Sequence, residues 1–574
     1  MRNKKKCIYK LYLGYYFFMQ IFNDKLFINP IKIIKAFDKE SFTKAFDLLE
    51  HYKKNNFYLL GYIKYEAYNY FLNINNNYKS KLPVLYFEVY EKYQKYKYDI
   101  KEDKTIHIAT IEDIDKNKYI NNINEIKNYI KNGITYEVNY TYPSIVYTDC
   151  SDDYFLYQSI LKHQKTNYNA FIKNEYETIL SFSPELFFKI ENNKIITKPM
   201  KGTIKRGKTK IEDLKNINFL KTDKKNMSEN LMIVDLLRND LSKIAKIGTV
   251  KVDRLFEVET HLTIHQMTST ISAILDENVN LYNIFKAIFP CGSITGAPKI
   301  STIKIIKKLE QNERGIYCGA IGLISRNNAI FQVPIRTLYK QNNWDNYKIN
   351  TGGAIVWDSI PKDEWEEAKL KKEFLKTDFE LIETMKVKNR RIFLKQLHLK
   401  RLKKTAKKFG FKINNKLNNL IPKYNSCMMR LLMNKSGHLK IEYKDFKASK
   451  SNVIHIAKNK TNSNNIFMYY KTTNRMWYSE TMLKLGEDKI FDEIFTNQKN
   501  QITEGARSNI LIKKDNVYYT PSLKCGLLNG CFRQFILKKL NVIEKTLYID
   551  DLKNADKIFC INSLRGMVEV ELKL

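Results

Sequence analysis

The sequence lacks the features that mark secreted and membrane proteins. Its eight cysteines, among 574 residues, are scattered without a Cys-x-x-Cys pair, which favours reduced thiols over a disulfide framework. Residues 1–18 are basic and then aromatic, but they have neither a long apolar core nor a small-residue cleavage site, so they match a signal peptide poorly. We expect a soluble cytoplasmic protein without a membrane partner, in which residues 1–18 are an N-terminal extension and either Met1 or Met19 is the start.

Histidine is equally scarce, and several binding patterns are missing. The eight histidines are dispersed, and no cluster of histidine and cysteine has the spacing of metal ligands. The glycine-rich stretches match neither the P-loop nor the dinucleotide-binding fingerprint. Any metal ion should therefore be held by oxygen ligands, and the glycines should mark places where the backbone comes close to a small ligand.

Acidic residues are too few to balance the basic ones. Asp and Glu number 61 against 98 Lys and Arg, which gives a formal net charge of +37. Basic surfaces attract nucleic acid, but lysine is spread from end to end without a basic tail, so we expect no specific nucleic-acid partner and only weak adhesion. A basic RNA-binding or scaffold protein with degenerate enzyme domains stays an alternative, which salt-dependent RNA retention would test.

Length and composition indicate a globular chain with more than one domain. Hydrophobic residues make up 44% of the chain, and single cores rarely grow past about 250 to 300 residues, so at least two domains are expected. Periodicity predicts helices at about 41–54, 119–131, 227–243 and after 361, and strands at about 57–65, 134–144, 168–172 and 179–190. From residue 379 a strand, a turn, a second strand and an amphipathic helix open a further domain.

The most informative stretch is Lys198–Gly207, which reads KPMKGTIKRG. A lysine followed by glycine at the end of a strand-like run can present an amine where backbone and substrate approach closely, so Lys201 is a candidate nucleophile. Taken alone, a Lys-Gly pair in a lysine-rich chain is more often a turn. Glu185, in the short Ser-Pro-Glu sequence upstream, is expected on a neighbouring strand or its connection.

Three glutamates on two predicted helices could hold a cation. Glu229 lies in the helix over 227–243, for which Ser228 is a plausible cap, and by itself it could simply be an acid that favours the helix dipole. Glu364 and Glu367 are three residues apart on one face of the helix after Pro361. Carboxylates from two helices, completed by waters, suit Mg²⁺ because that ion prefers hard oxygens and keeps part of its hydration shell.

One arginine is placed where it needs an anion. Arg336 is expected inside the apolar strand FQVPIRTLY. A guanidinium buried in such a strand requires a negative partner, and a substrate carboxylate suits its fork.

In chain order these stretches resemble the chorismate-utilising enzymes, over about residues 20 to 375. The matching motifs are Ser183-Pro184-Glu185, Pro199 to Thr203, Glu229 to Leu236, Gly296 to Lys299, Ile335-Arg336-Thr337 and Glu364 to Glu367. Within that family, the lysine before Gly-Thr is similar to component I of aminodeoxychorismate synthase, whereas anthranilate synthases usually have alanine there. For residues 19–375 the resemblance implies an α+β fold, a β-sandwich with helices like that of anthranilate synthase component I.

The resemblance implies a binding role for several residues. Mg²⁺ on Glu229 and Glu367, with Glu364 helping directly or through water, would hold the ring carboxylate of chorismate. The residues implied to bind the substrate are Arg336 and Tyr317, on the enolpyruvyl carboxylate, together with Gly353, Lys299 and Thr203.

The resemblance also implies the catalytic groups. Lys201 would attack the ring as the 4-hydroxyl leaves, with Glu185 as the general acid, and ammonia would then expel the lysine. Lys201 must be neutral to attack, and burial near a divalent cation should lower its pKa. His265 is given no catalytic role, because Gln266 aligns with the histidine of the anthranilate synthases.

Residues 378–574 contain, in order, HLKRL around Arg401, YYKTTNR around Lys471, ITEGARSN around Glu504, GLLNGCFR, and Asn562-Ser563. These motifs resemble the class IV pyridoxal-phosphate enzymes, which have an α+β fold of the branched-chain or D-amino-acid aminotransferase type. The resemblance implies Lys471 as the Schiff-base lysine, Glu504 as the partner of the pyridine nitrogen, and Arg401 and Ser563 on the cofactor phosphate. Where the phosphate loop usually offers small or hydroxylated residues this chain has Cys531 and Phe532, so backbone N–H groups are expected to supply the contacts there.

Together the two resemblances imply a synthesis of 4-aminobenzoate for folate. The first domain would convert chorismate and ammonia to 4-amino-4-deoxychorismate, and the second would eliminate pyruvate from it. The sequence has no glutaminase elbow with a cysteine nucleophile, so ammonia should come from a glutamine amidotransferase subunit or from solution. A homodimer is possible by analogy. The alternative is an anthranilate synthase component I fused to a class IV amino-acid aminotransferase, against which Lys201 argues.

Overall fold

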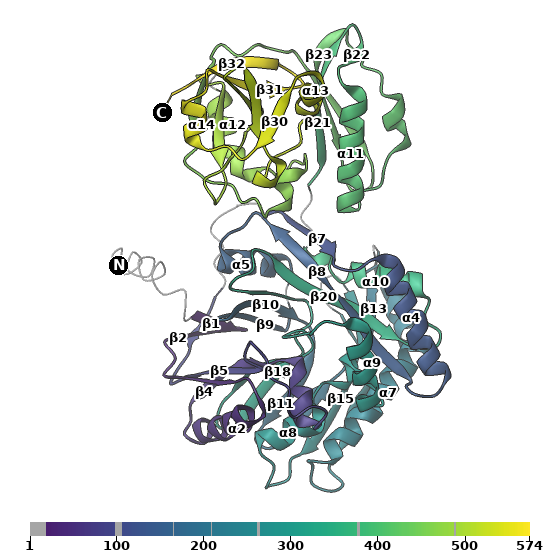
Figure 1. Cartoon of the computed structure of the whole chain (residues 1–574). Coiled ribbons are helices and arrows are strands. Elements are labelled where there is room, and N and C mark those ends of the chain that lie inside the picture. Colours follow the sequence, from purple (N-terminus) through teal and green to yellow (C-terminus); the bar gives the residue numbers. More distant parts are fainter. Residues whose placement is uncertain are drawn as a thin grey trace, which may run out of the picture. The chain divides into compact units, whose positions relative to one another are not determined.

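The structure is a computed structural model that describes residues 19–97, 106–164, 166–207, 209–260, 264–375, 379–486 and 489–573. The expected extension at residues 1–18 lies outside the described residues. Contacts divide the chain into two units (Figure 1). The first ends at Leu375, and the second comprises residues 376–574 together with the short stretches 105–111 and 147–151, which include most of β7 (Ile108–Glu112).

Two antiparallel sheets form the first unit. One runs in the order β16 (Gly296–Ala297), β8 (Glu137–Thr148), β20 (Tyr347–Ile355), β19 (Thr337–Gln341), β10 (Glu177–Ser183), β9 (Tyr168–Lys173), β1 (Met19–Phe22), β2 (Lys25–Ile28) and β6 (Gln94–Lys95). The other runs in the order β13 (Met200–Lys205), β15 (Ile264–Ile274), β12 (Lys194–Lys198), β11 (Leu186–Glu191), β18 (Asn328–Gln332), β17 (Ala320–Ile324), β4 (Tyr58–Ile63), β5 (Leu85–Tyr90) and β3 (Lys32–Ala36), and β14 (Lys251–Thr260) pairs with β15.

The two sheets pack face to face and helices cover their outer faces (Figure 1). The core between the sheets joins side chains such as Phe22 and Ile179 of one sheet to Tyr62 and Leu323 of the other. Around the second sheet lie α2 (Lys39–Lys54), α7 (Lys224–Ser242) and α8 (Leu281–Ile288). Around the first lie α4 (Lys116–Lys131), α9 (Lys299–Glu310) and α10 (Pro361–Leu370). This is the expected β-sandwich with helices.

Three further helices of the first unit are α3 (Tyr68–Phe71), α5 (Asp153–His163) and α6 (Lys210–Thr222). Most predicted elements are present, but the start of α7 differs. Asp223, not Ser228, is its N-cap, and the Asp223 carboxylate accepts a hydrogen bond from Asn226 N at 2.9 Å. The helix therefore begins earlier than predicted, because Asp223 supplies the acceptor that its first turn needs.

The prediction that Arg336 lies inside a strand is wrong. It lies in the connection between β18 and β19 and has a φ of +50°. The preceding Pro334 has no N–H to give to a ladder, so the strand stops before it. Arg336 is thus held by a turn, and its carbonyl accepts a hydrogen bond from Phe182 N at 3.2 Å.

The expectation that the glycines face a small ligand fails at two positions. A Cβ on Gly296 would lie 2.0 Å from the carbonyl oxygen of Glu137, and one on Gly352 would lie 1.9 Å from that of Tyr140. These glycines let neighbouring strands approach each other. Gly353 is different, because a Cβ there would meet Glu364 Oε2 at 2.9 Å.

The second unit has two sheets of its own. An antiparallel sheet runs β22 (Arg391–Ile392), β21 (Leu381–Lys388), β23 (Ser426–Met433) and β24 (Leu439–Lys444). A mixed sheet runs β27 (Ile502–Gly505), β26 (Asp492–Thr496), β25 (Val453–Ile456), β32 (Gly566–Leu572), β31 (Lys557–Asn562), β28 (Asn509–Lys514), β29 (Val517–Pro521) and β30 (Val542–Lys545). The helices are α11 (Lys395–Phe409), α12 (Ser479–Gly486), α13 (Cys531–Lys539) and α14 (Ile549–Lys553).

The opening of this unit follows the prediction. The hairpin of β21 and β22 turns at Asn389 and Arg390, which both have positive φ, and α11 ends at Gly410 in the left-handed region. Within the described ranges, every helix is too short or too polar to cross a membrane.

Candidate active sites

Lys201 is presented by an irregular part of β13. Gly202 has a φ of +78°, and a Cβ there would lie 2.9 Å from the side chain of Asn226 on α7. Only glycine fits this approach without strain. A close approach at the Lys-Gly pair was predicted for a substrate. In the structure, the group that comes close to Gly202 is Asn226 of helix α7. The pairing of β13 with β15 shifts register between Met200 and Thr203, around the lysine.

The amine of Lys201 is paired with a carboxylate that sequence reasoning missed. Lys201 Nζ donates a hydrogen bond to Glu137 Oε1 at 2.6 Å, and the side chains are 8% and 0% exposed. Glu137 is the first residue of β8. Its signal in the sequence is slight: an acid within the apolar stretch YEVNY.

The expected lowering of the Lys201 pKa assumed a bound divalent cation, and the protein groups by themselves shift it upward. Burial favours the neutral amine, but the carboxylates of Glu137, Glu229 and Glu185 outweigh it and raise the pKa. The reason is that the neighbours of Lys201 are acids, and opposite charges stabilise the ammonium form.

Glu185 lies in the connection between β10 and β11. As predicted, it is next to the strand that precedes Lys201, because its neighbour Leu186 pairs with Lys198 of β12. It is 3% exposed and accepts a hydrogen bond from Ser293 Oγ at 2.6 Å. Burial raises the pKa of Glu185 to about 7. A carboxyl group of this kind can be protonated near neutral pH, which suits a general acid.

Arg336 has the character of an anion-binding group. Among the described residues, its guanidinium has neither a hydrogen bond nor an ion pair, and burial lowers its pKa. A cation held out of water without a counter-charge is costly. Tyr317, the other residue implied to hold the same carboxylate, is 5% exposed and belongs to the main hydrophobic cluster, where burial raises its pKa strongly.

The three predicted metal ligands lie on α7 and α10. Glu364 accepts a hydrogen bond from Ser359 Oγ at 2.7 Å, and burial raises the pKa of Glu364. Glu367 pairs with Lys371 at 2.9 Å, which lowers its pKa. Burial raises the pKa of Glu229, whose oxygen lies 4.0 Å from Lys225 Nζ.

Two of the three acids converge on one point, and all three offer the oxygen donors that a hard cation prefers. The Cβ position of Gly353 lies 2.9 Å from Glu364 Oε2 and 4.0 Å from Glu367 Oε1, so both carboxylates gather over a residue without a side chain. In the described part of the chain, the oxygens of Glu229, Glu364 and Glu367 do not all lie within 4.8 Å of one another. The donors are all oxygens, as Mg²⁺ prefers. In this structure Lys225 and Lys371 neutralise part of the negative charge of Glu229 and Glu367.

Two of the residues implied to bind substrate are already engaged. Lys299 donates to Asp240 Oδ2 at 2.8 Å and to the carbonyl of Ile288 at 3.1 Å. Thr203 accepts a hydrogen bond from Gln266 Nε2 at 3.2 Å. His265, which was assigned no catalytic role, is fully buried between Asp213 and Thr260, each at 2.9 Å.

In the second unit, all four residues implied to bind the cofactor line one cavity of about 720 Å³. They are Arg401 of α11, Lys471, Glu504 of β27 and Ser563. The start of α13 and the turn after β31 also line it. A cavity of this size with convergent polar groups is suited to a cofactor-sized ligand.

Lys471 and Glu504 have complementary properties. Among the described residues, no hydrogen bond or ion pair engages Lys471 Nζ. Burial, helped by Arg475 and Arg401, lowers the pKa of Lys471 to about 7. Burial likewise raises the pKa of Glu504 to about 7, and Glu504 accepts hydrogen bonds from Tyr478 OH at 3.0 Å and Asn509 Nδ2 at 3.1 Å.

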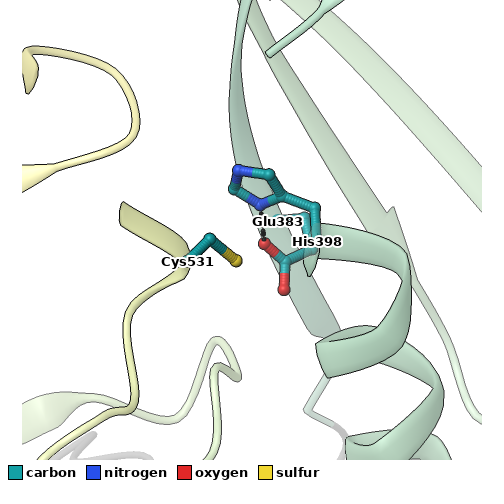
Figure 2. Close-up of side chains that lie close together, drawn as sticks. All are labelled: Glu383, His398 and Cys531. Carbon is teal, nitrogen blue, oxygen red and sulfur yellow. Dashed lines mark hydrogen bonds and ion pairs between the residues drawn. The ribbon is translucent and has the colours of Figure 1, made fainter. Parts of the chain in front are cut away.

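Arg401 is anchored by a buried acid, Glu383 of β21. Arg401 donates to both Glu383 oxygens, at 2.8 and 2.6 Å, and Glu383 Oε2 also bonds His398 Nδ1 at 2.6 Å. Figure 2 shows the Cys531 sulfur facing the side chains of Glu383 and His398, and one ligand atom from each of Glu383, His398 and Cys531 lies within 4.8 Å of the others. Because Arg401 and His398 already engage both carboxylate oxygens, we interpret the group as a support for Arg401 rather than as a metal centre.

Several residues of this second site escaped sequence reasoning. They include Glu383, which stands in the alternating strand LIETMKV, and Arg475, which ion-pairs with Glu504 at 3.5 Å. An acid on the buried face of an alternating strand was the available signal for Glu383. Arg475 had only its proximity to Lys471 in sequence.

The comparison with protein families decides the identity of the first unit. The family model for chorismate binding enzymes matches residues 13–377. The chain belongs to the chorismate binding enzymes. The model for class IV aminotransferases matches residues 380–572, so this family member carries a second domain of that type. The fold class expected for both domains is thereby confirmed.

Curated relatives and a solved structure agree with this family. Anthranilate synthase component 1 of Saccharolobus solfataricus is 31% identical over 372 residues, covering 62% of this chain and 86% of that protein. The chloroplastic aminodeoxychorismate synthase of Arabidopsis thaliana is 39% identical over 277 residues, covering 48% of this chain but only 30% of that protein. The crystal structure of anthranilate synthase component I from Streptococcus pneumoniae shares the fold, with a TM-score of 0.53 at 21% identity over 62% of this chain and 92% of that one.

Proposed function

We propose that this protein makes 4-aminobenzoate from chorismate in two steps on one chain. The first unit replaces the 4-hydroxyl of chorismate with an amino group, and the second removes pyruvate from the product. The observation that carries the proposal is the presence of two buried lysine sites of different chemistry, around Lys201 and Lys471. Relatives named aminodeoxychorismate synthase support the first step.

In the first unit the residues divide the work between charge and acid catalysis. Glu229, Glu364 and Glu367 would hold Mg²⁺, which supplies positive charge for a carboxylate of the substrate. Arg336 would bind the other carboxylate, because its guanidinium lacks a partner within the described chain. Lys201 would attack the ring while Glu185 donates a proton to the leaving hydroxyl.

In the second unit the residues fit pyridoxal phosphate. The cavity offers an unengaged amine at Lys471, an acid at Glu504 and, from Arg401 and Ser563, groups for a phosphate. The cofactor, when bound, withdraws electrons from the substrate carbon that loses a proton. Lys471 would carry that proton, and Glu504 would hold a proton at the pyridine nitrogen through charge attraction.

The nitrogen source belongs to the proposal. We expect a glutamine amidotransferase subunit to deliver ammonia to the protein in the cytoplasm. In an assay of the purified protein, ammonium salts can replace that subunit. The proposal includes a homodimer, and size-exclusion chromatography of the same purified protein tests it.

A product assay tests the function. Purified protein is incubated with chorismate, Mg²⁺, ammonium and pyridoxal phosphate, and the products are separated by chromatography. We expect 4-aminobenzoate and pyruvate in equal amounts. Anthranilate in their place would show that the alternative, an anthranilate synthase with an attached aminotransferase, is correct, and an unchanged chorismate peak would reject both.

A further inference from the structure

The buried acid beside Lys201 is not explained by any role given so far. Glu137 Oε1 accepts the hydrogen bond from Lys201 Nζ at 2.6 Å. In the described part of the chain its second oxygen, Oε2, is buried and has no hydrogen-bond partner. A buried carboxylate oxygen without a donor is costly, so its retention calls for a reason.

The backbone of Glu137 is held by the glycine-rich stretch that the sequence made conspicuous. Ala297 of β16 pairs with Glu137, and Gly296 has no Cβ to collide with its carbonyl oxygen. Thr135 Oγ1 also donates to that carbonyl at 3.1 Å. The backbone of Glu137 is therefore held at the start of β8 by its pairing with β16.

Lys201 needs a proton acceptor if it is to act as a nucleophile. The charged groups that act on Lys201 are Glu137, Glu229, Glu185 and Glu367. Its Nζ donates a hydrogen bond to Glu137, so the amine holds a proton that must leave before it can attack. Glu185 is engaged by Ser293 and Glu229 lies beside Lys225. Among the described residues, Glu137 alone accepts a hydrogen bond from the amine.

We propose that Glu137 is a catalytic base that holds Lys201 Nζ by a hydrogen bond and takes its proton before attack. The N–H bond of the ammonium breaks, its electron pair stays on Nζ, and an O–H bond forms on Glu137. The pair remains neutral overall, so the transfer creates no net charge in a buried site. This inference rests on the proposed function, because it assigns the base for the nucleophile of the first step.

Together with Glu185 this gives the site two carboxyl groups with opposite tasks. Glu137 is bonded to the amine and accepts a proton, while Glu185 is bonded to a serine hydroxyl and donates one. Different surroundings can give two carboxyl groups in one site different proton affinities. This is a common way for an enzyme to pair a base with an acid.

Steady-state kinetics of the full chain test the proposal, with ammonium as nitrogen source and saturating Mg²⁺. For Glu137→Gln we expect kcat for chorismate consumption to fall on the order of 100-fold at every pH, while KM changes by less than about threefold. Glu137→Asp keeps a carboxylate and should recover part of the rate. If Glu137 only stabilised the ammonium form, Glu137→Gln would keep the wild-type kcat and move the pH profile to lower pH, and that result would overturn the proposal.

A matched control separates catalysis from folding. Glu177 and Lys64 form a buried pair at 2.8 Å, with side chains 2% and 6% exposed, and neither has a role in the site. Glu177→Gln should leave kcat unchanged, and circular dichroism compares the folds. If Glu137→Gln does not fold, Glu137→Ala decides, because it also removes the carboxylate: an unchanged kcat rejects the proposal. A wild-type protein that consumes no chorismate rejects the proposed function and this inference together, whereas active wild type with unaffected Glu137 variants rejects the inference alone.

Discussion

The two lysines at the centres of the two units are in opposite electrostatic surroundings. Lys201 is bonded to a carboxylate and surrounded by acids, which raise its pKa. Lys471 has arginines as neighbours and is buried, so its pKa falls to about 7. The same side chain thus has a raised pKa in one site and, in the other, a pKa low enough for a substantial neutral fraction near pH 7. The difference teaches that Lys471 is ready to react with an aldehyde, whereas Lys201 must first lose a proton to a neighbour.

Removing each lysine in turn should separate the two reactions completely. Lys471→Ala should lower 4-aminobenzoate formation by at least about 1000-fold and leave chorismate amination intact, because only the second site loses its amine. Lys201→Ala should show the reverse and still convert added 4-amino-4-deoxychorismate. Chromatography of both products measures this. If Lys201→Ala also stopped the second reaction, the two sites would not be independent.

Removing divalent cations should affect only the site with the acids. With a chelator present, chorismate consumption should fall by at least about 100-fold, since the carboxylates of Glu229, Glu364 and Glu367 would then repel the substrate. Elimination from added 4-amino-4-deoxychorismate should not change. Adding back Mg²⁺ is the control. An equal loss of both activities would show that the cation supports the whole chain and not one site.

Raising the pH should weaken acid catalysis in the first unit. Burial raises the pKa of Glu185 to about 7, and the protonated form is the one that donates. Above pH 7 the protonated fraction falls, so kcat for amination should drop about tenfold per pH unit at constant free ammonia. Glu185→Gln should lose this dependence along with most of the rate. A flat profile in the wild type would exclude Glu185 as the acid.

Removing a positive neighbour should make Lys471 behave more like an ordinary lysine. For Arg475→Ala the pKa of Lys471 should rise by about one unit, because Arg475 is the largest of the charges that lower it. The pH at which cofactor-free protein binds pyridoxal phosphate at half its maximal rate should rise equally. Arg430→Ala, which alters another arginine lining the same cavity, is the control. Equal shifts in both variants would point to a general charge effect.

Local patterns in the sequence were sufficient for most of the architecture. Alternation and helical periodicity located α2, α4 and α10 and the strands around Lys201. An element that buries one face needs apolar residues at regular intervals, and this pattern is visible in the local sequence. The cap of α7 was missed since Asp223 and Ser228 are both good capping residues, and only the packed helix selects between them. The end of the strand before Arg336 follows from Pro334, which has no backbone N–H for a ladder. The apolar pattern on both sides of Pro334 had predicted a continuous strand.

The candidate site divides in the same way. The sequence by itself determined the residue types and their order: Lys201, Glu185, the three glutamates, and Lys471 with Glu504. Only the tertiary structure placed Glu137 on Lys201 and Glu383 on Arg401, partners that lie 64 and 18 positions away. It also decided the direction of the Lys201 pKa shift. Such effects depend on which charges meet after folding, and distances in space are not encoded in any short stretch of chain.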